Sequence, residues 1–115
     1  MSGKWNIEIQ QGATFNPPAI YWKDSAETPI NLTGWTARMQ IRPAVNSDTV
    51  LMELNTENGR ITLGGVAGSI TLTIIDDDTA LIDWNQGVYD LFLTNGVYTK
   101  KLLYGNVKVS KAVTR

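Results

Sequence analysis

The chain has 115 residues, contains neither cysteine nor histidine, and carries a formal net charge of −1. These absences exclude disulfides and thiolate metal sites and remove the commonest general base. The near-neutral charge and the lack of a long apolar run argue against nucleic-acid and membrane partners. The length predicts one domain spanning residues 1–115, and the start of the chain lacks the basic-then-apolar order of a signal peptide.

The dominant hydrophobic period is two, which is the period of a strand with one buried face. Near the N-terminus Trp5, Ile7 and Ile9 alternate with polar residues, so residues 1–11 are a first strand or an N-terminal arm. The clearest strand lies in residues 35–42, where every second residue is apolar. Further strands are predicted at 19–23, 50–54, 60–63, 69–74, 88–94, 98–104 and 106–109.

Turn signals separate these strands. Pro17 and Pro18 disfavour helix, and residues 64–68 predict a glycine-rich hairpin connection rather than a phosphate cradle, because strands flank them on both sides. Asn95-Gly96 predicts a tight hairpin turn, and Gly105 a bend or bulge. Residues 76–82 are the only helix-like stretch, and we expect an aspartate to cap it.

Eight or nine short strands with one short helix predict an all-β fold: an antiparallel two-sheet sandwich. A small barrel is the alternative. A parallel α/β sheet is disfavoured, since the sequence offers no crossover helices.

Few residues offer catalytic or metal chemistry. The run Asp76-Asp77-Asp78 supplies oxygen ligands of the kind calcium prefers, but it lacks the spacing of a calcium loop and fits a helix start better. The remaining carboxylates are scattered, and no spacing selects a pair for acid–base work. We therefore expect no enzymatic activity, no cofactor, no metal and no small-molecule substrate.

Aromatic residues are better candidates for function. Trp5, Trp35 and Tyr89 fall on apolar strand faces and are expected in the core. Trp22, Trp84 and Tyr104 are the candidates for protein contact, where Trp and Tyr are enriched. An aligned, exposed row of the same three residues would instead bind sugar rings, as in a carbohydrate-binding module.

Seven strings carry a family resemblance through their order and spacing. They are NLTGWTARMQIR (31–42), NGRITL (58–63), GSITL (68–72), TAL (79–81), YDLFLT (89–94), LLYGNVKV (102–109) and VTR (113–115). Over residues 12–115 the chain resembles a group of small tailed-bacteriophage proteins encoded among virion structural genes. It is also similar to the N-terminal immunoglobulin-like domain of phage baseplate upper proteins. Asn31 departs from the acid expected there, and Tyr104 from a polar residue.

The resemblance implies an immunoglobulin-like sandwich that assembles into a virion at the tail, baseplate or neck, with no catalytic residues to carry over. The expected partners are other phage virion proteins and further copies of the chain, assembled in the host bacterial cytoplasm. We expect residues 1–11, or the segment with Pro17 and Pro18, to pack on a neighbouring subunit. Capsid decoration is the alternative location.

Overall fold

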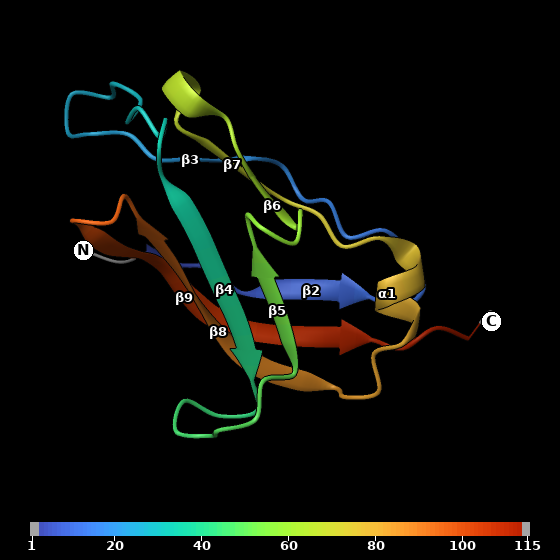
Figure 1. The fold of residues 1–115 in the computed structure, drawn as a ribbon. Helices are drawn as coiled ribbons and strands as arrows, with labels where there is room; N and C mark the ends of the chain where they lie inside the picture. Colours follow the sequence, from blue (N-terminus) through green and yellow to red (C-terminus); the bar gives the residue numbers. More distant parts are fainter. Residues whose placement is uncertain (1–2, 114–115) are drawn as a thin grey trace.

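The computed structural model describes residues 3–113 and shows two β-sheets packed face to face, with one short α-helix in that range (Figure 1). The strands are β1 (Gly3–Lys4), β2 (Ile7–Gln10), β3 (Ile20–Tyr21), β4 (Thr36–Arg42), β5 (Met52–Asn55), β6 (Ile61–Leu63), β7 (Ser69–Leu72), β8 (Gln86–Thr94) and β9 (Thr99–Ser110). A 3-10 turn, η1, covers Gly65–Ala67, and the helix α1 covers Asp76–Ala80. The predicted all-β sandwich is confirmed.

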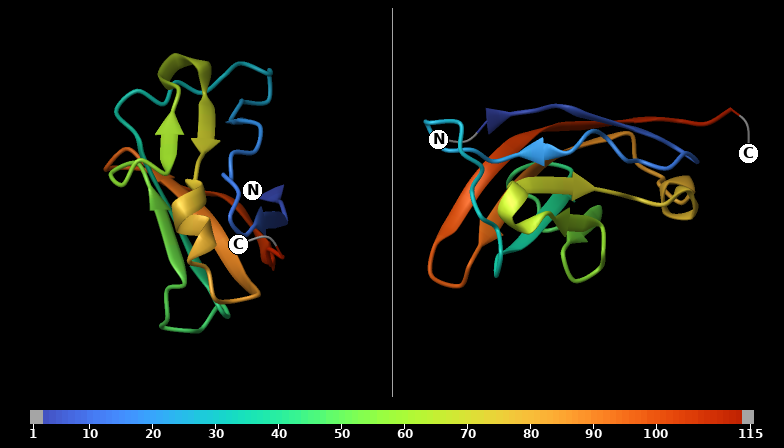
Figure 2. Two further views of the ribbon diagram at one scale, coloured as in Figure 1. Left: turned by 90° about the vertical axis from the view of Figure 1, so that its right-hand side faces the viewer. Right: turned by 90° about the horizontal axis from the view of Figure 1, so that it is seen from above.

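The larger sheet has six strands in the order β1-β9-β8-β4-β5, with β2 also paired to β9. The smaller sheet has the order β3-β7-β6 and covers one face of the larger sheet (Figure 2). Among residues 3–113 no ladder joins the two sheets, so the barrel alternative is wrong. One face of the larger sheet therefore packs in the core, and its other face is open to solvent.

Alternating side chains build the core between the sheets. In β4 the buried residues are Ala37, Met39 and Ile41, as their spacing predicts. From the smaller sheet Ile70 and Leu72 face them, both almost fully buried. Each fully buried Leu or Ile contributes roughly 1.5–3 kcal/mol of transfer free energy. This burial explains why register is strongly specified, since a slip of one residue would turn the apolar set outward.

The first two strands run parallel to β9, which differs from the antiparallel pairing we predicted. Ile7 lies opposite Val107 and Ile9 opposite Val109. A parallel pair needs a long connection, and here nearly the whole domain separates β2 from β9. Residues 3–10 therefore belong to the domain's own sheet.

Gly105 serves a purpose other than the predicted bend, because it lies inside the continuous strand β9. A Cβ atom at this position would collide with the backbone carbonyl of Trp5. The same carbonyl accepts a hydrogen bond of 2.6 Å from the Tyr89 hydroxyl. Tyr89 is in the core as predicted, whereas Trp5 and Trp35 are only partly buried against it. Gly105 thus permits a close crossing of the N-terminal segment over β9.

A buried polar junction fixes α1. The prediction of an aspartate cap is wrong: Ile75 occupies the N-cap position and makes no side-chain cap. The helix is held instead by the Thr79 hydroxyl, which donates to the carbonyl of Ala13 at 2.8 Å and accepts from the amide of Gly12 at 3.1 Å. Thr79 is the one fully buried polar residue in the described range. It therefore ties α1 to the turn after β2.

Candidate protein-contact surface

The solvent-facing side of the larger sheet, called the outer face below, is the broadest candidate surface. Cross-strand register places its residues in rows. One row runs over five strands from Lys4 through Tyr104, Asp90 and Gln40 to Glu53. The neighbouring rows comprise Arg42, Val88 and Asn106 on one side and Asn55, Arg38, Phe92 and Lys101 on the other. Aromatic, amide and charged groups thus lie together on one rigid surface.

Two shallow hollows lie on the outer face. The first, called the Tyr104 hollow, encloses about 320 Å³, and its outward lining residues are Lys4, Gln40, Arg42, Val45, Val88, Asp90, Lys101, Tyr104 and Asn106. The second encloses about 630 Å³ around Arg38, Phe92 and Thr94. Strands β4 and β8 contribute residues to both hollows, so the two hollows belong to one continuous surface.

The two hollows together carry a small excess of positive charge. Lys4, Arg38, Arg42 and Lys101 are cationic, and Glu53, Glu57 and Asp90 are anionic, which leaves a formal excess of one positive charge on a chain whose total is −1. Negative charge is therefore concentrated elsewhere on the molecule. Such segregation of charge steers the approach of partners with the opposite sign.

A hydrogen-bond network surrounds the Glu53 carboxylate at the edge of the outer face. Its carboxylate accepts from the side-chain amides of Asn55 at 2.9 Å and Gln40 at 3.0 Å. These hydrogen bonds, with a smaller contribution from the nearby guanidinium groups of Arg38 and Arg42, lower the pKa of Glu53. The carboxylate therefore stays ionised and engaged within the network.

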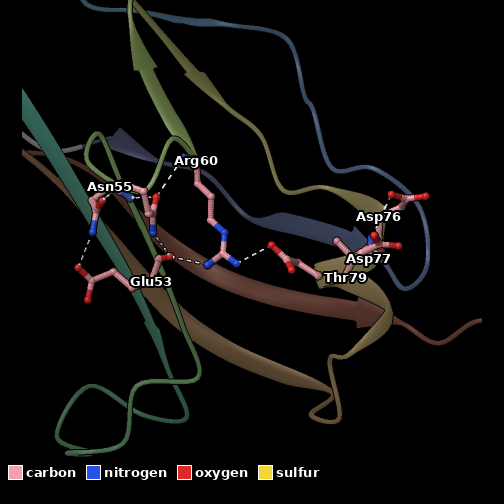
Figure 3. Close-up of polar contacts among 8 residues, drawn as sticks. Glu53, Asn55, Arg60, Asp76, Asp77 and Thr79 are labelled. Carbon is pink, nitrogen blue, oxygen red and sulfur yellow. Dashed lines mark hydrogen bonds and ion pairs between the residues drawn. The ribbon is translucent and has the colours of Figure 1, made fainter.

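The same region seals the free edge of β5 (Figure 3). The backbone carbonyl of Glu53 accepts from the side chains of Arg60 at 2.9 Å and Asn58 at 3.0 Å, and the Asn58 side-chain oxygen accepts from the backbone amide of Asn55 at 3.1 Å. Arg60 also pairs with Asp78 at 2.7 Å. Edge groups satisfied in this way are poor templates for strand addition. Partners are thus directed away from this edge.

The five residues predicted for protein contact do not form one site. Tyr104 lies on the outer face, 40% exposed, with the Lys101 ammonium 5.5 Å from its ring centre. Trp84 is partly buried and lines a separate hollow near Arg60. Pro17 is partly buried and Pro18 exposed, in the segment that leads to β3. None of the three hollows, the two on the outer face and the one near Arg60, is lined by more than one of these five residues.

Trp22 belongs to an aromatic contact that sequence reasoning missed. Its ring meets Trp35 edge to face at 5.3 Å, and Trp35 meets Tyr98 edge to face at 6.2 Å. The three residues come from separate loops. In the sequence, each of these three aromatic residues lies directly beside a turn. Strand ends from both sheets meet at such turns, so this position was the signal that could have indicated the contact. Trp22 and Trp84 therefore both pack against the core instead of forming an exposed row with Tyr104.

The three aspartates of residues 76–78 have different surroundings in the fold. Asp78 pairs with Arg60, whereas Asp76 and Asp77 remain exposed in the first turn of α1. Within the described residues no three His, Cys, Asp or Glu side chains gather as a metal site would require. The helix found in this part of the chain is too short and too polar to cross a bilayer.

Comparison with models of known protein families and with curated proteins gives no match for this chain.

Proposed function

We propose that the chain is a non-enzymatic structural subunit or adaptor of a tailed-bacteriophage virion, placed at the tail, baseplate or neck, which acts by protein–protein association. It is made in the cytoplasm of the host bacterium and joins further copies of itself and other virion proteins. The sequence resemblance suggests the particle. The outer face carries the argument for association.

The outer face has the properties of a protein interface. It presents partly exposed aromatic residues, Phe92 and Tyr104, together with Arg38 and Arg42, and aromatic and arginine side chains are enriched in contact surfaces. Its two hollows can receive protruding groups of a partner with a complementary shape. Short hydrogen-bonded rows across five strands hold these groups on rigid elements, so little ordering entropy is lost on binding.

Assembly is the property to measure. We expect the purified protein to form oligomers by light scattering and closed or stacked particles in negative-stain electron microscopy. Co-expression with the products of the flanking genes should yield a complex that is retained on a tag carried by this chain. A monomer that copurifies with none of these products would refute the proposal.

A matched pair of variants tests the outer face. Tyr104→Ala removes an aromatic group from this face, and Tyr21→Ala removes one of similar exposure from the smaller sheet. Truncating an interface aromatic costs roughly 1–2 kcal/mol or more, so Tyr104→Ala should weaken association by about tenfold. Tyr21→Ala should leave it unchanged. Absent assembly combined with glycan binding that depends on Tyr104 would instead support the carbohydrate-binding alternative.

A further inference from the structure

The Tyr104 hollow combines apolar and cationic groups in a way that selects its partner. Val45 and Tyr104, 89% and 40% exposed, provide apolar surface beside Val88. Lys4, Arg42 and Lys101 outnumber the one carboxylate of this hollow, Asp90, which lies 4.0 Å from the Lys101 ammonium. The Lys4 ammonium has no hydrogen-bond or ion-pair partner among residues 3–113. The hollow therefore suits a segment that is apolar and acidic together.

A segment with this chemistry lies on the chain itself, at the end of the sandwich that carries α1. Ile75 and Leu81, 54% and 80% exposed, flank the exposed carboxylates of Asp76 and Asp77. These four residues are called the α1 end. The third aspartate of the run is already held in an ion pair. Figure 1 shows α1 beside the end of β9, at the opposite end of the molecule from the β8–β9 turn.

The α1 end cannot fill the hollow of its own molecule. Thr79 anchors α1 to the turn after β2, and the two surfaces share no residue. We propose that the α1 end docks into the Tyr104 hollow of a second copy of this chain, so that copies join head to tail. This inference rests on the proposed function and specifies the surfaces through which the subunit associates with itself.

Charge decides between this arrangement and a symmetric one. A two-fold contact centred on the Tyr104 hollow would bring Lys4 and Lys101 of each copy toward the same cations of the other, which is unfavourable. A head-to-tail contact sets cations against Asp76 and Asp77. Contacts of this heterologous kind produce rings when the rotation closes and filaments when it does not. Both products suit a repeated virion component.

A charge exchange tests the contact. The first variant, Lys4→Glu with Lys101→Glu, makes the hollow acidic, and the second, Asp76→Lys with Asp77→Lys, makes the α1 end basic. Each variant alone should fall to the 12.7 kDa of one chain by light scattering. Mixed in equal amounts they should assemble again, because each acidic surface then meets a basic one. Assembly of the wild-type chain should weaken as salt screens these charges.

A control and a second measurement guard against misfolded variants. Glu27→Lys with Asp48→Lys makes the same charge change as the second variant at two exposed carboxylates that line neither hollow of the outer face, and it should assemble like the wild type. Carbodiimide coupling of the wild-type chain should form amide bonds between Lys4 or Lys101 of one copy and Asp76 or Asp77 of another, as peptide mass spectrometry would show.

Each failure has its own meaning. Variants that assemble like the wild type, or a mixture that stays monomeric while each variant remains folded by circular dichroism, would overturn the head-to-tail contact and leave the structural role intact. A wild-type chain that is monomeric but retained in complexes with other virion proteins would also overturn it alone. A monomer without any such partner would overturn both proposals.

Discussion

The junction at Thr79 offers the sharpest test of how the fold is held together. Its hydroxyl lies where α1 meets the turn after β2, and the residue is fully buried. The substitution Thr79→Val keeps the shape of the side chain but removes the hydrogen bonds to the Ala13 carbonyl and from the Gly12 amide. The backbone carbonyl and amide left behind then lose their partner.

The loss of folding stability depends on how far water can replace the hydroxyl as a hydrogen-bond partner. A buried polar group left unsatisfied costs about 1–3 kcal/mol, and here two are affected. Gly12 and Ala13 are themselves exposed residues, so solvent relieves part of this loss. We expect Thr79→Val to lower the free energy of unfolding by about 2 kcal/mol. Thr79→Ser keeps the hydroxyl and loses one methyl group, which costs about 1 kcal/mol.

Urea unfolding of the three proteins, with the slope of each transition compared, measures these differences. Amide exchange adds a local readout, since the Gly12 amide should lose protection in Thr79→Val. A valine variant as stable as the wild type, or more stable than the serine variant, would refute the reasoning that the hydroxyl fastens α1.

Three further changes have defined outcomes. Gly105→Ala should destabilise by about 1–3 kcal/mol in urea, since its Cβ meets the Trp5 carbonyl; an unchanged midpoint would contradict the close crossing. Tyr89→Phe should cost about 1 kcal/mol. Because burial raises the pKa of Tyr89, the unfolded chain releases that proton first, so wild-type stability should fall above about pH 10 more steeply than the variant's. Equal slopes would argue against the buried hydroxyl. Asn58→Ala frees the Asn55 amide at the β5 edge and should speed aggregation in time-resolved light scattering, whereas an unchanged rate would show that other groups protect this edge.

The β5 edge of the larger sheet is closed to strand addition. The β5 edge is closed by Asn58 and Arg60, and β1 and β2 cover one edge of β9. The edge groups of β5 thus already have hydrogen-bond partners within the chain.

Local pattern predicted most of the strands. In β4 the apolar residues recur at every second position, and burial of Ala37, Met39 and Ile41 follows directly. The hairpin that joins β6 to β7 through residues 64–68 was likewise predictable, since both strands and their glycine-rich turn are contiguous in sequence. Such features depend on neighbours along the chain, and composition and spacing report on those neighbours.

Long-range features were decided only by tertiary structure. The parallel pairing of β2 with β9, the Thr79 junction and the use of Gly105 each join segments that are far apart in sequence, where hydrophobic period carries no information about the partner. The outer face arises in the same way. The alternation within β4 and β8 specifies which of their residues face outward, but only the strand order brings Lys4 and Tyr104 into one row. Sequence alone therefore determined the strands, and their packing determined the surface they share.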